Sequence, residues 1–420
     1  MSKAIKDLIV FFALLTPCMP KIGISEEITI LPIEILLFLL FPFILKYNKF
    51  RVQRLLYGVW VTILVSTLLS CIMIPNLGGV LRGIKELIYI PIAYVTYKCN
   101  WLSWKHISYS FICASCISFV FLASAGFSFS SMSIWDNSLL LSGMSNKYLD
   151  VRSFSIVNID RGAHGIFSNY CSLALCSTFI AYRKKEIRKI VLIIVLLLVC
   201  SCVGMSVSRE GLIVFFSVIA SFVFCKFKEG KIRTHIGLYL FITFFLLVII
   251  YVINEYGENI ALVQKLLYTQ QSVEDSGEEG NIALRIGGWA VFFRSLFYYP
   301  YMAIIGYGFN NMYYESFLDF ARLYKFRYVT GPESFFVECL MYGGIIALFF
   351  GIRWWRQIYI IICKVSDGNI KFFSKGLFWG LLFVNTFSGA SIVSDMLYCQ
   401  FLVFIGLIIR EVTLNTKFRV

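Results

Sequence analysis

The chain has 420 residues, of which 59% are hydrophobic and only 15% are charged. Soluble domains carry roughly 25% charged residues, so this composition excludes a soluble enzyme and a secreted disulfide scaffold. A helix needs about 20 mainly apolar residues to cross a bilayer, and the composition could supply about a dozen crossings. The formal net charge of +14 falls mostly in short connections between apolar segments, which argues against nucleic acid as a partner. The sequence therefore predicts a polytopic membrane protein.

Hydropathy predicts an all-α fold with about twelve transmembrane helices in a single domain, 1–420. The predicted spans cover residues 5–20, 30–46, 55–75, 82–98, 107–126, 162–182, 189–207, 211–226, 235–254, 334–352, 376–392 and 395–412. Two long loops, 127–161 and 255–333, interrupt this series. No small-residue cleavage site follows the first apolar segment, so we expect that segment to remain as an anchor.

Basic residues predict the orientation of the helices. Most of the 38 Lys and Arg residues lie in alternate connections, such as 46–54, 183–189 and 353–375. The positive-inside rule places these connections in the cytoplasm, so both termini are predicted to be cytoplasmic and both long loops to face outward. The cytoplasmic connections are too short for a nucleotide-binding domain and contain no Walker A or Asp-x-Asp motif. We therefore expect no cofactor and no metal, with the chemistry at the outer face.

The second long loop is unusually aromatic, with 16 aromatic residues in the 40 residues from 289 to 328. Residues 283–298 and 310–324 have helical spacing of their rings, including Trp289, so two short amphipathic helices are predicted. One interpretation is an interfacial pair of helices with aromatic anchors. The other is that some of the rings stack on sugar faces, and both interpretations can hold for different residues.

Ionisable residues gather at the predicted outer ends of the spans. They are Glu34, Arg82, Lys85, Glu86, Arg161, His164, Arg209, Glu210, Glu333, Glu338 and Asp395. A charge at the bilayer centre costs about 2.5–3.5 kcal/mol even on insertion scales, and such charges usually mark function. Each residue alone could be an anchor that extends to the headgroups. Together they predict a polar cavity open to the outer leaflet, with arginines suited to phosphate.

An ordered set of short motifs resembles the O-antigen polymerase (Wzy-type) and O-antigen ligase superfamily. The motifs are Arg82-Gly-Ile-Lys-Glu, Arg161-Gly-Ala-His-Gly-Ile-Phe-Ser-Asn169, Ser208-Arg209-Glu-Gly211, Arg285-Ile-Gly-Gly-Trp289, Ile305-Gly-Tyr-Gly-Phe309 and Glu333-Ser-Phe-Phe-Val-Glu-Cys-Leu-Met-Tyr-Gly-Gly344. No single motif is specific, but their order, spacing and predicted sidedness cover the layout of nearly the whole chain.

The resemblance implies a metal-independent glycosyltransferase of the bacterial inner membrane, with its active site facing the periplasm. It would transfer a growing glycan from undecaprenyl diphosphate onto the next undecaprenyl-diphosphate-linked repeat unit. The implied catalytic residues are Arg285, Arg209, Glu338 and Glu333, and the implied diphosphate- or sugar-binding residues are Arg82, Arg161, His164, Asn169 and Trp289. The expected partners are the lipid-linked repeat units, the lipid bilayer and a membrane protein that regulates chain length.

Two other functions remain open at this point. A ligase, which transfers the glycan to lipid A core, shares most of these motifs, and a polysaccharide flippase or transporter also suits twelve spans. Family members, ligases especially, often have a His-Asn pair where the large loop re-enters the membrane, but this chain has Gly331-Pro-Glu-Ser there. The missing histidine favours a polymerase over a ligase and leaves the base to Glu338, Glu333 or His164. A transporter should have internal repeats or broken helices at the midplane, and the sequence predicts neither.

Overall fold

The computed structural model describes residues 3–19, 22–23, 29–40, 47, 49–73, 75, 77–124, 163–206, 209–228, 292–293, 296–297, 300–309, 334–387 and 395–417. Its helices are α1 (Lys3–Leu15), η1 (Thr16–Cys18), α2 (Pro32–Leu39), α4 (Arg51–Met73), α5 (Leu77–Tyr89), α6 (Ile92–Lys98), α7 (Trp104–Ser124), α10 (Ala163–Arg183), α11 (Lys189–Ser206), α12 (Arg209–Lys228), α16 (Met302–Ile305), α18 (Phe335–Cys363), α19 (Gly368–Phe387) and α20 (Asp395–Lys417). The described chain is therefore helical, as predicted. A short antiparallel pair, β1 (Ile22–Gly23) and β2 (Thr29–Ile30), departs from the all-α expectation.

The helices have the apolar character expected of a membrane protein. Among the described residues, three segments are long and apolar enough to cross a bilayer, namely Arg51–Ile72, Phe335–Cys363 and Leu397–Leu414. Two shorter apolar helices cover Lys189–Val203 and Glu210–Cys225. Every predicted span except 235–254, which lies outside the described residues, overlaps a helix. Three spans are thus supported by length and composition, and the full number of twelve remains a prediction.

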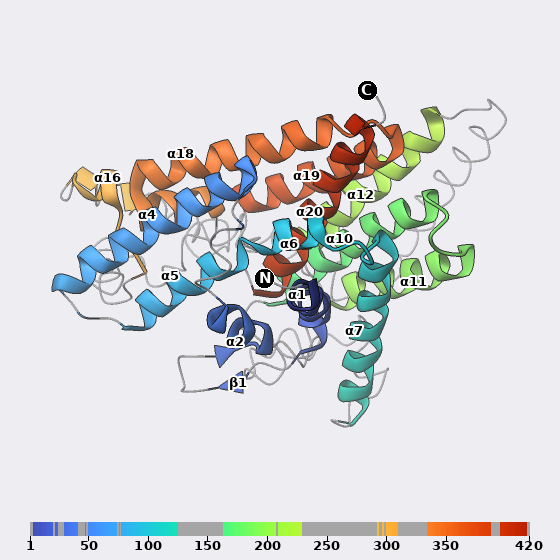
Figure 1. The fold of residues 1–420 in the computed structure, drawn as a ribbon, viewed down its shortest axis with the longest axis horizontal. Coiled ribbons are helices and arrows are strands. Elements are labelled where there is room, and N and C mark those ends of the chain that lie inside the picture. The colour runs from blue at the N-terminus through green and yellow to red at the C-terminus, as the bar shows by residue number, and fades with distance from the viewer. Residues whose placement is uncertain are drawn as a thin grey trace, which may run out of the picture.

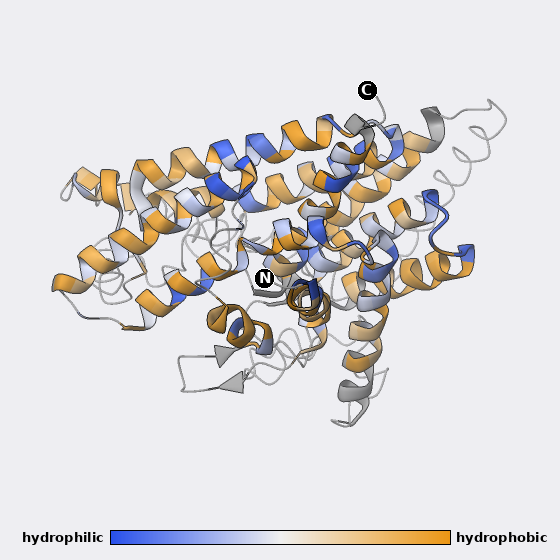
Figure 2. Cartoon of the chain, in the orientation of Figure 1, coloured by the Kyte–Doolittle hydropathy of each residue, from blue (hydrophilic) through white to orange (hydrophobic). Residues whose placement is uncertain are grey.

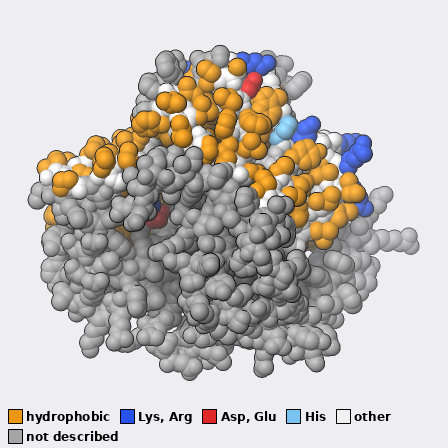
Figure 3. Space-filling view, turned by 90° about the horizontal axis from the view of Figure 1, so that it is seen from below, with side chains coloured by type: hydrophobic (Ala, Val, Ile, Leu, Met, Phe, Trp, Pro, Cys, Tyr) orange, Lys and Arg blue, Asp and Glu red, His pale blue; other side chains and the backbone are white. Residues whose placement is uncertain are grey.

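Exposed apolar side chains form stripes along three helices. The stripes are Val65, Leu68, Leu69 and Ile72 on α4, Ile190, Ile193, Ile194 and Leu197 on α11, and Ile345, Ile346, Phe349 and Ile352 on α18. On α4 and α11 the spacing is i, i+3, i+4 and i+7, and on α18 it is i, i+1, i+4 and i+7, so in each stripe the four side chains lie on one helix face. Figure 2 shows how apolar residues dominate the helices, and Figure 3 shows apolar side chains covering much of the described surface, with Lys and Arg near its margins. Surfaces of this kind fit contact with lipid.

Two helices are interrupted where an uninterrupted span was predicted. The predicted span 82–98 is divided into α5 and α6, because Pro91 caps α6 and cannot donate a backbone hydrogen bond to the preceding turn. In α18, Gly344 has a non-helical backbone, with φ 65° and ψ −166°. The prediction of unbroken helices was therefore wrong. The end of the tenth span was also misplaced, since α18 continues past residue 352 to Cys363.

Helix packing brings distant parts of the sequence together. The most extensive contacts join α4 to α18, α12 to α19 and α10 to α12. In Figure 1, α4, α5 and α18 lie along the long axis with α16 beside the start of α18, whereas α7 runs across that direction. The largest fully buried side chains include Trp104, Trp354, Tyr398 and Phe111.

A cluster of polar contacts ties together the ends of α6, α10 and α20 and the start of α7. The Arg410 guanidinium donates to the carbonyl oxygens of Cys99 and Leu102, at 2.9 and 2.6 Å. The Glu411 carboxylate accepts from Trp104 Nε1 at 3.2 Å and pairs with the Lys184 ammonium. We call Cys99, Trp104, Lys184, Arg410 and Glu411 the terminal polar cluster. All five lie at or beside connections that the sequence predicts to be cytoplasmic, so the fold brings one predicted side of the chain together.

Candidate functional site

The segment Ile305-Gly-Tyr-Gly-Phe309, from the predicted outer loop, packs directly on the kink of α18. The backbone N–H groups of Tyr307 and Gly308 donate to the carbonyl oxygens of Met341 and Tyr342, at 2.7 and 2.8 Å. In an unbroken helix those carbonyls would bond with N–H groups beyond Gly344. The loop therefore supplies hydrogen-bond donors to the turn that precedes the kink.

The same segment is held from the other side by α4. Phe309 N donates to Thr67 Oγ1 at 2.8 Å, and the Ser66 hydroxyl donates to the Ile305 carbonyl. Gly308 has φ +66°, and a Cβ added there would lie 2.4 Å from Thr67 Cα. Only glycine combines this backbone conformation with so close an approach. The glycines of the motif thus allow the loop to fit between α4 and α18.

Arg82, a predicted substrate-binding residue, lies against this loop. Its guanidinium carbon is 4.4 Å from the centroid of the Phe309 ring, which is a cation–π distance. One turn earlier on α5, a Cβ at Gly79 would come within 2.0 Å of the Phe309 carbonyl oxygen, so glycine lets the two backbones touch. The Arg82 side chain is exposed. Stacking on the ring occupies one face of the guanidinium, while its N–H groups point in the guanidinium plane.

Glu338, a predicted base, lies in the first turn of α18, one turn before Tyr342. The Tyr342 ring contacts the Phe309 ring, with centroids 5.0 Å apart. Arg82 contacts Phe309, which packs on Tyr342, so Arg82 and Glu338 lie near the same ring from two different elements. We call Arg82, Phe309, Glu338 and Tyr342 the loop–helix junction. Of the nine predicted site residues, the structure brings Arg82 and Glu338 together here.

A buried ion pair lies one turn behind Arg82 on α5. The Lys85 ammonium is 3.0 Å from Glu34 Oε1, and the same carboxylate accepts from the Tyr89 hydroxyl at 2.5 Å and from Leu31 N at 2.8 Å. Glu34 is only 4% exposed. The sequence placed Glu34 and Lys85 among charges around a polar cavity, but this pair joins α2 to α5 inside the fold and neutralises itself. Its role is to fix α5, and with it the position of Arg82.

Three further predicted residues lie on α10 and α12. Arg209 begins α12 and His164 is in the first turn of α10, but their side chains lie outside what the structure describes. Asn169 on α10 is fully buried, and its amide has no hydrogen-bond partner among the described residues. A Cβ on Gly211 would lie 2.0 Å from Ser168 Oγ, so the starts of α10 and α12 touch beside Asn169. These residues therefore form a second group, on a different helix pair from the loop–helix junction.

The remaining four predicted site residues, Arg161, Arg285, Trp289 and Glu333, lie outside the described residues, as do all of loop 127–161 and the predicted helix 310–324. Of the predicted helix 283–298, the structure describes helical pieces at 292–293 and 296–297. Phe292 is buried and Phe293 is 47% exposed, so these two adjacent rings lie in different environments.

Sequence reasoning did not assign a role to Phe309, Tyr342 or Thr67. The signal for the first two was present, because both belong to motifs that carry the family resemblance, Gly-Tyr-Gly-Phe309 and Tyr342-Gly-Gly. Thr67 had no signal, since an isolated threonine in an apolar helix usually bonds to its own backbone. In the part of the chain that the structure describes, no group of three or more His, Cys, Asp or Glu side chains is placed to hold a metal ion.

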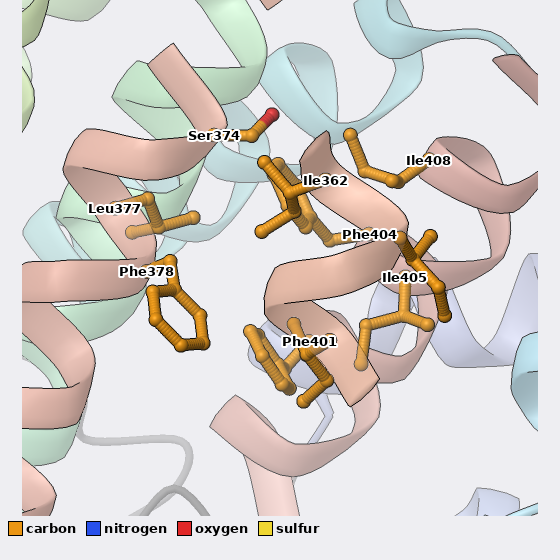
Figure 4. Close-up of a pocket in the computed structure, with 10 residues that line it drawn as sticks. Ile362, Ser374, Leu377, Phe378, Phe401, Phe404, Ile405 and Ile408 are labelled. Atoms are coloured by element: carbon orange, nitrogen blue, oxygen red, sulfur yellow. The ribbon is translucent and has the colours of Figure 1, made fainter. Parts of the chain in front are cut away.

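An apolar pocket lies between the later turns of α18 and helices α19 and α20 (Figure 4). Its lining includes Ile362, Leu377, Phe378, Phe404 and Ile405, and Ser374 is the one polar lining residue among the ten. The pocket contains no charged group that could stabilise a leaving diphosphate or accept a proton. It is therefore a packing feature, and the loop–helix junction remains the candidate site.

The sequence matches no protein-family model and no curated protein. The functional interpretation therefore rests on the residues, their arrangement and the resemblance carried by the motifs.

Proposed function

We propose that the chain polymerises lipid-linked oligosaccharide repeat units, as an O-antigen polymerase of the Wzy type in a bacterial inner membrane. The observation that carries the proposal is that Arg82 and Glu338, an arginine and a carboxylate from distant motifs, both lie near Tyr342 at the loop–helix junction, Arg82 through its contact with Phe309 and Glu338 one turn earlier on α18. A glycosyl transfer from a diphosphate needs a cation for the leaving group and a base for the acceptor hydroxyl. The junction offers one of each, on the segments whose motifs resemble this superfamily.

In the proposed reaction, a hydroxyl oxygen of the acceptor repeat unit attacks the anomeric carbon of the donor glycan. The bond between that carbon and the diphosphate oxygen breaks, and undecaprenyl diphosphate leaves with the electron pair. Glu338 accepts the hydroxyl proton and later releases it to water. Arg82, with Arg209 and Arg285 as the other candidates, stabilises the negative charge on the leaving diphosphate. The donor's own diphosphate bond supplies the energy, so no nucleotide is needed.

Aromatic rings at the junction suit the sugar part of such a substrate. Phe309 packs on Tyr342 and also lies 6.1 Å from the Trp60 ring, nearly parallel to it at 21°. An aromatic plane packs well against the apolar face of a pyranose, as the sequence interpretation of this loop anticipated. Phe309 is itself only 5% exposed, so it holds Arg82 in place, and the sugar contacts fall to Tyr342 and to other rings of the loop.

The interruptions in α5–α6 and α18 favour one second candidate, a polysaccharide transporter. Broken helices often line substrate sites in transporters, and Gly344 and Pro91 break two helices here. However, the break at Gly344 is filled by the loop segment through two backbone hydrogen bonds. A transporter would move the lipid-linked unit without lengthening the glycan, so the length of the product separates the two functions.

The test is reconstitution of the purified full chain in liposomes with a synthetic undecaprenyl-diphosphate-linked repeat unit, without nucleotide and with a metal chelator. The proposal expects a ladder of longer glycans and release of undecaprenyl diphosphate in equal amount to the bonds formed. Substrate that stays one repeat long would contradict the proposal. If that unextended substrate moved between leaflets, the transporter would be favoured. Adding lipid A core as the acceptor distinguishes a ligase, which would transfer the glycan to the core.

A further inference from the structure

A second polar site lies where the end of α6 meets the start of α1 and residue Tyr47. Lys98 Nζ lies 4.9 Å from the centroid of the Tyr97 ring and 5.8 Å from that of Tyr94, and Lys6 Nζ lies 5.7 Å from that of Tyr47. The Tyr47 and Tyr94 rings stack at 5.6 Å. We call these five residues the lysine–tyrosine cluster. It joins three segments that are distant in sequence, and all three belong to the predicted cytoplasmic side.

The carboxylates of the predicted cytoplasmic side that the structure describes here bond to donors outside the cluster. Asp7 accepts from the Cys99 thiol at 3.3 Å, and Glu186 accepts from the backbone of Lys105 at 3.1 Å. Glu411 is paired with Lys184. Within the described part of the chain, neither Lys6 nor Lys98 forms an ion pair. A cation–π contact holds an ammonium in place without neutralising it, so each of the two lysines keeps its positive charge beside an aromatic ring.

Apolar side chains are exposed on α1, which carries Lys6, and on the neighbouring helix α2. On α1, Leu8 and Phe11 are 43% and 50% exposed, and on α2, which packs against α1, Phe38 and Leu39 are 57% and 70% exposed. A free phosphate ion would gain nothing from these side chains. A phospholipid has a phosphate for the lysines and acyl chains for the exposed apolar side chains, so both halves of the site have a counterpart in one ligand.

We propose that the lysine–tyrosine cluster binds the phosphate headgroup of an anionic phospholipid, whose acyl chains pack on the exposed apolar residues of α1 and α2. Basic sites between membrane helices on the cytoplasmic side bind anionic headgroups, with about 1 kcal/mol per Lys or Arg near the surface. The tyrosines hold the ammonium groups at the level of the headgroup, where amphipathic rings are enriched. The site does not depend on the proposed polymerase activity.

The test is native mass spectrometry of the delipidated full chain titrated with dioleoylphosphatidylglycerol, and in parallel with dioleoylphosphatidylcholine. We expect the wild type to bind the anionic lipid more tightly than the zwitterionic one. The double variant Lys6→Gln and Lys98→Gln should bind phosphatidylglycerol about tenfold more weakly. The double variant Lys6→Arg and Lys98→Arg should keep most of the affinity, because it keeps both charges.

The matched control is Lys189→Gln with Lys364→Gln, which removes the same charge from two exposed lysines elsewhere. It should bind phosphatidylglycerol like the wild type. An equal loss in the control would overturn the proposal, since the effect would then follow net charge alone. Equal binding of the two lipids would also overturn it, as would displacement of the lipid by millimolar inorganic phosphate, which would indicate a site for free anions. Melting temperatures of all variants check that the chains are folded.

Discussion

The loop–helix junction and the terminal polar cluster contain the same kinds of side chain but hold them differently. In the terminal polar cluster, Arg410 donates to two backbone carbonyls, and Glu411 is 6% exposed and bonded to Lys184 and Trp104. At the junction, Arg82 is exposed with its guanidinium 4.4 Å from the centroid of the Phe309 ring, and Glu338 is partly exposed in the first turn of α18. The comparison teaches that similar side chains differ in exposure: the carboxylate that joins helix ends is buried, whereas the arginine and the carboxylate proposed to meet a substrate keep part of their surface accessible.

The largest expected effect is on the rate of glycan extension, and it should distinguish Glu338 at the junction from Glu411 in the terminal polar cluster. Glu338→Gln removes the proposed base and should lower the rate of glycan extension by about 10²–10⁴-fold, the usual contribution of general base catalysis. The free energy of unfolding should change little, because Glu338 is partly exposed. The measurement is the initial rate of undecaprenyl diphosphate release in liposomes at saturating lipid-linked substrate.

Glu411→Gln is the matched change in the terminal polar cluster. It should lower the free energy of unfolding by about 1–3 kcal/mol, because it leaves Lys184 without its partner in a partly exposed pair. The rate per folded molecule should stay near the wild-type value. If the Glu338→Gln variant extended the glycan at the wild-type rate, Glu338 would not be the base.

The next comparison is between Arg82 at the junction and Arg356, an exposed arginine on α18. Arg82→Ala should lower the extension rate by about 10²–10³-fold, as expected for loss of one group that stabilises developing negative charge. Arg82→Lys should recover part of the rate, since it restores the charge but not the planar guanidinium. The exposed Arg356→Ala is the control and should extend normally. If Arg82→Ala and Arg356→Ala gave equal glycan ladders, Arg82 would have no role in the reaction.

Gly344→Ala tests whether the kink of α18 supports the junction. The alanine would need φ near +65°, and its Cβ would lie 2.0 Å from the Ile304 carbonyl oxygen, so either the kink or the loop must move. We expect a loss of about 1–3 kcal/mol in the free energy of unfolding, together with slower extension. Gly368→Ala is the matched control, because a Cβ there meets nothing within 4 Å. A Gly344→Ala chain as stable and active as Gly368→Ala would show that the kink is dispensable.

The smallest effect concerns the Cys99 thiol of the terminal polar cluster. Burial, aided by the hydrogen bond to Asp7, raises the pKa of Cys99 to about 12. Because the thiolate is the reactive form, only about one Cys99 in 10,000 should be ionised at pH 8. Maleimide labelling at pH 8, followed by peptide mass spectrometry, should leave Cys99 unmodified while the more exposed Cys363 reacts. Rapid labelling of Cys99 in the folded chain would contradict the enclosed arrangement, and denaturation should make it reactive.

The sequence could predict where helices lie, because apolar periodicity is a local signal. It could not predict the kink at Gly344. The carbonyl groups just before the kink accept hydrogen bonds from the backbone N–H groups of Tyr307 and Gly308, more than thirty residues earlier in the sequence. The predicted end of the tenth span, at residue 352, was wrong for another reason. Hydropathy falls at Arg353, but a helix can continue beyond its apolar stretch, and α18 does so as far as Cys363.

The candidate site, like the fold, was predictable only where the signal is local. Charge and predicted sidedness predicted Arg82 and Glu338 on one outer face, and the orientation remains a prediction. Their meeting through Phe309 and Tyr342 depends on contacts between α5, the loop and α18, which no local pattern records. The ion pair between Glu34 and Lys85 was likewise invisible, since the sequence shows two charges but not that each is the other's partner.

The central claim is that cationic side chains gather on the periplasmic face to hold the diphosphate of a lipid-linked glycan. It is tested most directly by placing single cysteines at positions 82, 209 and 285 and at position 185 and labelling intact cells with a membrane-impermeant maleimide, with labelled sites read by peptide mass spectrometry. The account predicts that positions 82, 209 and 285 react from outside the inner membrane and that position 185 reacts only after the membrane is opened. Labelling of positions 82 and 285 from opposite sides would contradict it.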